Sequence, residues 1–497
     1  MRVDERPGSR PRGARRAVRA APPGLLLVLG LLLVPLAWVV TLPPFGGIDE
    51  FDHAFRAAAV ARGQVEATAP VPDGRGLLVR VPPDLVAAAH AECASLRYTG
   101  PDNCSPLGPP GADGLVDVGS AAAGYHPAFY WIVGTIARPF DGAAALTAMR
   151  LATVGLCGLL LGLAAYAAGR CGARAPGGAS WPRLALVVAC SPVLLYSTAV
   201  AAPNGVEMAA GLGVWLGGLA LLSGRDDPDP VGDRVLWLVL ALCAVVICSL
   251  RLLGPVFLAG IALTLVAWAP AAARDVLRRS RRAVVLTVLA AGLSAAQFLW
   301  WVRGPGSAVG SAGPGSDDVG LSPAHGVLWV VQAIAAYPYR NQFAPWPVYL
   351  LVAGAVIVVL QQLVRHAPAH AQRVVLGALA GALMLGFLAT IAAGDSRDGV
   401  IWQGRYGLPY AVGFVLLAGV GLARAGRTPS PRRRVGLLAA VMAAHVVGIL
   451  GVRASESRNP VALADASWHP LPVLGLVAVG LLGLGLLVRA TAPERTT

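Results

Sequence analysis

The sequence predicts an all-α polytopic integral membrane protein with about twelve transmembrane helices. Of its 497 residues, 56% are hydrophobic and only 13% are charged, whereas soluble proteins carry about 25% charged residues. Apolar runs recur from Leu25 to Val488, and each is long enough to cross a hydrocarbon core of about 30 Å. The runs do not alternate between polar and apolar residues as barrel strands do, so they predict helices.

Twelve spans fit the hydropathy, and the clustered arginines test their count. The expected spans cover residues 24–41, 145–169, 184–201, 205–223, 235–252, 254–271, 283–302, 347–364, 373–393, 407–424, 434–452 and 471–488. If the N-terminus lies inside, the arginine clusters at 278–282 and 432–434 both fall on the cytoplasmic side, as the positive-inside rule requires. We therefore expect a multi-pass protein of the cell membrane with both termini in the cytoplasm.

The expected organisation is a basic tail at 1–23, a single membrane domain at 24–490 and a short tail at 491–497. The first apolar run resembles a signal peptide, but it ends in TLPP without a small-residue cleavage pattern, which favours a retained anchor. The net charge of +14 follows from the arginines of the inner loops. Since no basic folded domain is present to carry it, we expect no nucleic-acid partner.

Two segments on the outer side are longer than simple connectors. The first covers 42–144, and its roughly one hundred residues predict a small folded or membrane-lying element. The second covers 303–346 and begins with the flexible composition GPGSAVGSAGPGSDDVG. The inner loops are too short for a nucleotide-binding domain and contain no Walker-type loop. We therefore expect any chemistry on the outer side, with extracytoplasmic or lipid-linked substrates.

Ionisable residues are concentrated in the stretch TLPPFGGIDEFDHAFRAAAVARG, directly after the first span. Asp49 suits a helix cap and Gly63 a helix stop. The residues between them predict an amphipathic helix that lies on the outer membrane surface. A carboxylate on it can act as a general base if its pKa is tuned, and solvated surface polarity with capping is the alternative. The polar face would hold Asp49, Asp52, His53 and Arg56.

Other polar residues are expected at the outer ends of spans. The segment YHPAFYW predicts a second interfacial helix that begins at His126. Arg251 lies near hydrocarbon, which suggests either a functional group or a side chain that snorkels to the interface. Arginine binds phosphate through paired hydrogen bonds, and tyrosine can stack on a sugar. We therefore predict a polar binding surface for a phosphate or a sugar, formed by Arg340, Gln403, Arg405 and Tyr406.

Two cysteines, Cys93 and Cys104, lie in the first outer segment. Because this segment would face an oxidising compartment, they predict a disulfide, with two unpaired thiols as the alternative. The other five cysteines lie in or beside spans and suit apolar packing.

The motifs PPFGGIDEFDHAFRAAAVARGQ, YHPAFYW and QGRYGLPY resemble those of a family of predicted polytopic membrane proteins of unknown function, frequent in actinobacteria. Its pattern includes P-x-D-E-x-x-H early and Q-G-R-Y late, and the resemblance covers about residues 24–490. That family is in turn similar to the C-type (GT-C) glycosyltransferases, which take sugars from polyprenyl-phosphate carriers. This chain departs from them in having an adjacent Asp-Glu pair and no soluble C-terminal domain.

The resemblance implies transfer of a sugar from a polyprenyl-phosphate donor to a cell-envelope acceptor on the outer face. Asp49 or Glu50 would deprotonate the acceptor hydroxyl or position it. The expected substrate-binding residues are Asp52, His53, Arg56, His126, Arg251, Arg340, Gln403, Arg405 and Tyr406.

The resemblance also bears on cofactors and on rival functions. No cofactor is expected, although some GT-C enzymes hold a divalent metal on acidic residues, as Asp49, Glu50 and Asp52 would allow. A transporter or flippase of lipid-linked saccharides and a non-catalytic envelope assembly protein are the alternatives. The identity of the sugar, the acceptor and the oligomeric state stay open.

Overall fold

The computed structural model describes residues 21–47, 49–223, 230–304, 321–337, 342–393 and 402–493. Within these ranges the protein is a mostly helical polytopic membrane protein, which confirms the predicted fold class. Ten helices there are long and apolar enough to cross a bilayer, or up to eleven if one bent pair counts as a span. The ten are α1 (Pro23–Thr41), α6 (Gly142–Ala173), α9 (Asn204–Leu222), α10 (Pro230–Leu250), α13 (Arg281–Arg303), α15 (Trp346–His366), α16 (Ala369–Ala393), the run of η1 (Gly404–Gly407), α17 (Leu408–Ala411) and α18 (Gly413–Arg424), α19 (Pro431–Glu456) and α21 (Val473–Ala490).

The count is below the expected twelve because two predicted spans are broken. The span expected at 184–201 consists of two short buried helices, α7 (Ser180–Ala189) and α8 (Pro192–Ser197). Pro192 has no N–H to continue the helix, and it pushes the preceding residue out of helical conformation. The span expected at 254–271 turns by 112° between α11 (Gly254–Trp268) and α12 (Pro270–Arg279), again directly before a proline.

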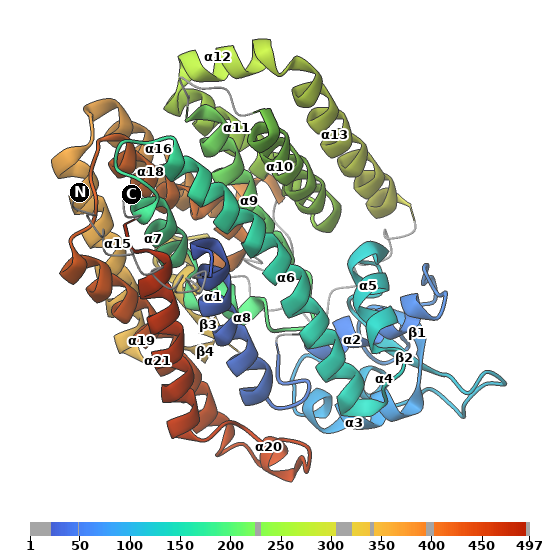
Figure 1. Cartoon of the computed structure of the whole chain (residues 1–497). Coiled ribbons are helices and arrows are strands. Elements are labelled where there is room, and N and C mark those ends of the chain that lie inside the picture. Colours follow the sequence, from blue (N-terminus) through green and yellow to red (C-terminus); the bar gives the residue numbers. More distant parts are fainter. Residues whose placement is uncertain are drawn as a thin grey trace, which may run out of the picture.

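The two ends of the helix bundle carry different structures. Helix α1 leads into residues 42–141, which fold against one end of the bundle (Figure 1). The indole Nε1 of Trp468, just before α21, donates to the Thr41 carbonyl at 3.0 Å, so α21 begins at this same end. We call it the loop end. The arginine-rich helix α12 crosses the opposite end (Figure 1), which we call the arginine end.

The segment at the loop end has its own small fold of helices around a strand pair. Strands β1 (Leu77–Val81) and β2 (Val116–Ser120) pair in antiparallel register, with Val79 opposite Val118. Both of these valines are buried beneath the surrounding helices. The helices are α2 (Glu50–Ala61), α3 (Pro83–Ala94), α4 (Pro101–Cys104) and α5 (Pro127–Ala137).

Helix α2 forms where the sequence predicts it, but it does not lie on a surface. It contacts α5 backbone to backbone, since a Cβ at Gly134 would be 2.1 Å from the Ala57 carbonyl oxygen. All residues from Glu50 to Val60 are buried, including the polar ones. The expectation of an interfacial helix with an open polar face is therefore wrong for α2. Arginines and backbone amides from elsewhere cover that face, and hydropathy alone does not reveal such partners.

The remaining described elements lie around the late spans. They are α14 (Pro323–Ile334), the two-residue strands β3 (Ala336–Tyr337) and β4 (Gln342–Phe343), and α20 (Pro460–Ala464). The predicted flexible stretch at 305–320, the residue Arg340 and the polar residues at 394–401 lie outside the described ranges.

Candidate functional site

Glu50 begins α2 and is held by the arginine of a transmembrane helix. Its carboxylate receives two hydrogen bonds from Arg150 on α6, at 2.6 and 2.8 Å, and both side chains are buried. The backbone N–H groups of Gly47 and Ala201 donate to the same carboxylate at 3.1 and 3.0 Å. These contacts occupy both oxygens of Glu50. They therefore favour a structural role for Glu50 over the role of catalytic base, which the sequence also allows.

Asp52 lies two residues after Glu50 on α2, on a different side of the helix, and is bound in a similar way. Its carboxylate accepts a hydrogen bond from Arg75 at 2.5 Å and another from the Ala121 N–H at 2.7 Å. The side chain is 1% exposed. Since Glu50 and Asp52 face different arginines, they do not form a shared metal site. Within the described ranges, no group of three or more His, Cys, Asp or Glu side chains could hold a metal ion.

Asp49 differs from these two carboxylates in exposure and in backbone. Its side chain is 25% exposed, and it contacts Arg75 Nη2 and the Tyr98 hydroxyl, both at 3.4 Å. It occupies the N-cap position of α2 as predicted, but its side chain makes no capping hydrogen bond. The backbone is left-handed, with φ 53°. Asp tolerates this conformation better than most residues, and such outliers are frequent at functional sites.

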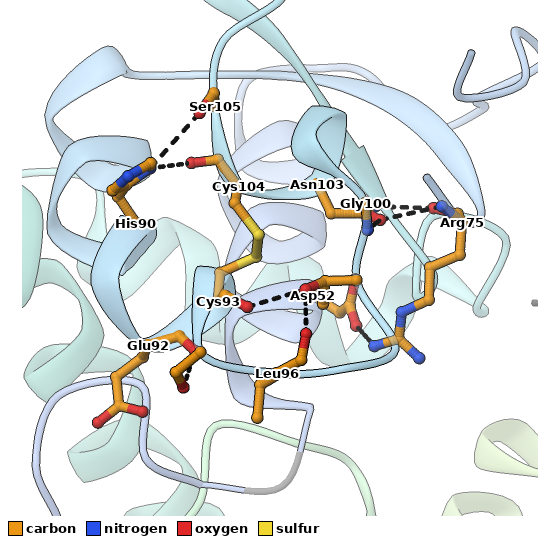
Figure 2. The surroundings of a disulfide bond; sticks show 12 residues. Asp52, Arg75, His90, Glu92, Cys93, Leu96, Gly100, Asn103, Cys104 and Ser105 are labelled. Carbon is orange, nitrogen blue, oxygen red and sulfur yellow. Dashed lines mark hydrogen bonds and ion pairs between the residues drawn. A yellow bond between two sulfur atoms is a disulfide. The ribbon is translucent and has the colours of Figure 1, made fainter. Parts of the chain in front are cut away.

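A disulfide braces the arginine that contacts both aspartates. Cys93 on α3 is bonded to Cys104 on α4, with Cα atoms 5.4 Å apart. Asn103, next to Cys104, exchanges two hydrogen bonds of 2.9 Å with the backbone of Arg75. Figure 2 shows the guanidinium of Arg75 pointing to Asp52 while its backbone meets Asn103. The Arg75 guanidinium also lies 4.5 Å from the ring of Tyr98 in the loop that the disulfide closes.

His53 lies one helical turn from Asp49, on the same side of α2. Its Nδ1 is 2.8 Å from the hydroxyl of Tyr130 on α5. Burial lowers the pKa of His53 to about 4, opposed by the charge of Asp49 and reinforced by that of Arg251. Burial also raises the pKa of Tyr130 well above its usual value. Both groups are therefore neutral at physiological pH, and His53 does not cancel the charge of Asp49.

Arg56 and His126 have partners within the protein. Arg56 donates to the backbone carbonyls of Val65 and Tyr125 at 2.7 and 3.0 Å, and burial lowers its pKa to about 10. The ring nitrogen Nδ1 of His126 caps α5 at 3.5 Å, and the ring lies 5.8 Å from that of Trp301. Burial lowers the pKa of His126, and the charge of Arg56 adds to this effect. These contacts favour structural roles over the substrate binding predicted for both residues.

Arg251 connects the first segment with the late QGRY motif. It lies in the turn between α10 and α11, hydrogen bonds Asn204, and its Nε is 3.3 Å from Glu207 Oε2. Its guanidinium also lies 4.6 Å from the ring of Tyr406. Burial raises the pKa of Tyr125, while the charge of Arg251 lowers it and that of Asp49 raises it. Asp49, Tyr125 and Arg251 therefore lie near one another.

Arg405 also lies close to the Tyr406 ring. Its guanidinium is 5.4 Å from the Tyr406 ring, and the residue is 4% exposed. Among the described residues, no carboxylate pairs with it, and its buried Nε and the buried Oε1 of Gln403 have no hydrogen-bond partner. The positive charge of Arg405 also lowers the pKa of His53. We call the group of Asp49, His53, Tyr125, Arg251, Arg405 and Tyr406 the loop-end polar cluster.

The glycine of the QGRY motif is required by close packing. The Gly404 N–H donates to the Gln332 side chain on α14 at 2.8 Å. A Cβ at this position would be 1.8 Å from the Trp329 carbonyl oxygen. Only glycine therefore allows η1 to pack this closely against α14. This packing also fixes the backbone position of the neighbouring Arg405.

An apolar cavity of about 300 Å³ lies within the bundle, next to the QGRY motif. Gly404 and Gly407, which flank the Arg405–Tyr406 pair, are part of its lining. The other walls come from α7, α14, α15, α16, α17 and α18, and include Trp329, Leu383 and Val415. The residues on both sides of the Arg405–Tyr406 pair therefore line a space suited to hydrocarbon.

Several residues of the site are absent from the expected set. Arg150 has a signal in the sequence, since an arginine within an apolar span is expected to pair inside the protein. Tyr125 and Tyr130 lie in the motif YHPAFYW, where His126 is the more obvious candidate. Arg75 has no such signal, because a lone arginine in a polar loop is usually solvated.

The chain was then compared with known proteins. A family model described as "Predicted membrane protein (DUF2142)" matches residues 32–414. No curated protein matches the chain. ArnT from Cupriavidus metallidurans bound to undecaprenyl phosphate has 17% identity and a TM-score of 0.44, with 95% of this chain and 78% of that chain covered. Its apo structure has 15% identity and a TM-score of 0.41, covering 93% and 76%. The family match includes both Asp49 and Arg405.

Proposed function

We propose, from the premise that this chain belongs to the DUF2142 family of predicted membrane proteins, that it is a glycosyltransferase-like enzyme. It transfers a sugar from a polyprenyl-phosphate donor to a hydroxyl of a cell-envelope acceptor. The reaction takes place in the loop-end polar cluster, on the extracytoplasmic face of the cell membrane.

The observation that carries the proposal is the environment of Arg405. A buried arginine without a carboxylate partner among the described residues is costly unless an anion compensates its charge. A phosphate suits it, because guanidinium groups bind phosphate through paired hydrogen bonds. The adjoining apolar cavity suits the hydrocarbon chain of the same molecule. A lipid phosphate satisfies both features at once, whereas a nucleotide sugar satisfies only the first.

Asp49 is the better of the two candidate bases. Glu50 is fully buried and receives four hydrogen bonds from Arg150 and two backbone amides. Asp49 is partly exposed, and its contacts with Arg75 and Tyr98 are long. A base must reach a substrate hydroxyl and accept its proton, which the surroundings of Asp49 allow.

The chemical step is a direct displacement with inversion at the sugar. Asp49 accepts the proton of the acceptor hydroxyl, and that oxygen bonds to the anomeric carbon. The bond from this carbon to the phosphate oxygen breaks, and the polyprenyl phosphate leaves with the electron pair. Arg405, with Arg251 near the same Tyr406 ring, stabilises the negative charge that develops on the phosphate.

A transporter of lipid-linked saccharides is the alternative. Transporters place ionisable residues near the middle of spans, where they bind the substrate. In this chain Arg150 on α6 is paired with Glu50, and Glu207 lies in the first turn of α9, near Arg251. Both groups belong to the loop end, which supports a site at the membrane surface.

The test uses purified protein in liposomes, supplied with radiolabelled polyprenyl-phosphate sugars and an acceptor extract. We expect label to enter a glycosidic product with the wild type, and to enter it far more slowly with Asp49→Asn or Arg405→Gln. Asp113→Asn is the matched control, since Asp113 is an exposed carboxylate of the same segment, paired with Arg80 at 2.7 Å. Labelled lipid that crosses the bilayer without forming a glycosidic bond would support the transporter instead. Unchanged transfer by Asp49→Asn would exclude that residue as the base.

A further inference from the structure

Helix α12 crosses the arginine end of the bundle and is amphipathic. It follows α11 after a bend of 112°, and Figure 1 shows it lying across the ends of the neighbouring helices. Ala273 and Val276 on its inner side are buried. The arginines on its other side are exposed. A helix of this kind, set across the bundle, suits the interface between headgroups and acyl chains.

The positive charge of this helix and of the start of α13 is largely uncompensated. Residues 270–282 contain five arginines and one aspartate. That aspartate, Asp275, lies 3.4 Å from Arg279, and both are exposed, so the pair contributes little. Within the described part of the chain, no carboxylate pairs with the other four arginines, which are Arg274, Arg278, Arg281 and Arg282.

An apolar cavity of about 270 Å³ lies directly beneath α12. Ala273, Val276 and Leu277 of α12 form part of its wall. The other walls belong to α9, α10, α11 and α13, and they are apolar apart from Thr287 and the indole nitrogen of Trp237. Water gains few hydrogen bonds in such a space, whereas a bilayer supplies hydrocarbon to fill it.

We propose that α12 and this cavity form a binding site for one anionic phospholipid. An acyl chain occupies the cavity, and the negatively charged headgroup is held by the arginines of residues 274–282. Helix α12 contributes both to the cavity wall and to the arginines, so a single amphiphile satisfies both halves of the site. An arginine near an anionic headgroup contributes about 1 kcal/mol, and burial of the chain adds to this. The site lies at the opposite end of the bundle from the loop-end polar cluster and is independent of the proposed reaction.

The charged half of the site is tested by titrating the protein in detergent with phosphatidylglycerol and with phosphatidylcholine. Native mass spectrometry counts the bound lipids. We expect one tightly bound phosphatidylglycerol and roughly tenfold or more weaker binding in Arg278→Gln/Arg279→Gln. The matched control is Arg432→Gln/Arg433→Gln on α19, which removes the same charge elsewhere at the arginine end and should leave binding unchanged. Equal affinity for the two lipids would overturn the proposal.

The apolar half is tested with two substitutions on α13. Ala291 lines the cavity and Ala290 does not. Ala291→Phe should therefore weaken phosphatidylglycerol binding, while Ala290→Phe should not. Loss of binding in the arginine variant together with full binding in Ala291→Phe would mean electrostatic attraction to the surface only, and would overturn the assigned site.

Discussion

Arg150 holds the carboxylate of Glu50 through two hydrogen bonds, from Nη2 at 2.6 Å and from Nε at 2.8 Å. The same guanidinium donates to the backbone carbonyls of Leu42 and Pro43, at the exit of α1. One arginine of a transmembrane helix therefore joins the end of the first span to the start of α2. The orientation of Asp49, the residue before Glu50, depends on this joint.

The first prediction concerns the stability that this ion pair provides. Glu50→Ala leaves the Arg150 guanidinium buried without its carboxylate, which costs about 3–5 kcal/mol in comparable buried pairs. We expect a clear drop in the melting temperature of the detergent-solubilised protein. Circular dichroism at 222 nm measures it.

The double variant Glu50→Ala/Arg150→Met supplies the control. Removing both charges avoids an isolated buried ion, so the double variant should be more stable than Glu50→Ala alone. If Glu50→Ala melted like the wild type and lost only transfer activity, Glu50 would be the catalytic carboxylate instead of Asp49.

The second prediction separates Asp49 from its neighbour. Asp49→Asn keeps the size of a partly exposed side chain, so the melting temperature should stay close to that of the wild type. Loss of a general base typically lowers the rate by about 10²–10⁴. The turnover number in the liposome transfer assay is the measurement. A variant that kept at least half of the wild-type turnover would contradict the assignment.

Much of this region could be predicted from the sequence, because its signals are local. The helix after the first span follows from its composition between Asp49 and Gly63, and Gly63 indeed has a positive φ of 96°. The burial of that helix could not be predicted. It depends on Arg150, which is 100 positions from Glu50, and on Arg75, and no local pattern connects these residues to α2.

The broken spans show a different reason for error. Hydropathy predicts one helix over 184–201 because every window in it is apolar. Pro192 is visible in the sequence and breaks the helix locally. A hydropathy average over the whole window does not register this local effect, so the break was not predicted. In the late motif QGRY, the sequence predicts Arg405 as a phosphate ligand. It contains no sign of the cavity next to this motif, whose walls come from five separate stretches of the chain.

The third prediction concerns the lipid phosphate. Arg405→Gln removes a buried charge that has no carboxylate partner among the described residues, so the protein should not lose stability. The affinity for the polyprenyl-phosphate sugar should fall by roughly 10- to 100-fold, since a charged hydrogen bond contributes about 1.5–3 kcal/mol. The KM for the donor measures this. Arg138→Gln, an exposed arginine at the C-terminal end of α5, is the control and should leave the KM unchanged.

The fourth prediction uses the lowered pKa of His53. The pKa of about 4 in the folded protein lies below the usual value of 6.5. Between these two values the unfolded chain binds a proton that the folded site rejects, so the free energy of unfolding falls as the pH falls. We expect the melting temperature to decrease from pH 7 to pH 4, and to decrease less in His53→Gln. The exposed residue His469 provides the control His469→Gln, which should keep the wild-type slope.

The last prediction links the disulfide to Asp49 through Arg75. The Cys93–Cys104 bond closes the loop that contains Tyr98 and Asn103, and these two residues hold the Arg75 side chain and backbone. Cys93→Ser/Cys104→Ser should cost about 2–5 kcal/mol of stability. It should also lower transfer activity at temperatures where the protein remains folded, because Arg75 would no longer be fixed beside Asp49 and Asp52.

Two measurements distinguish this effect from simple destabilisation. Asn103→Ala leaves the disulfide intact but removes both hydrogen bonds to the Arg75 backbone, so it should also lower activity. Cys157→Ser changes a buried cysteine of α6 outside this loop and should leave turnover unchanged. An Asn103→Ala variant with wild-type turnover would mean that the loop braces the fold without orienting Arg75 toward the base.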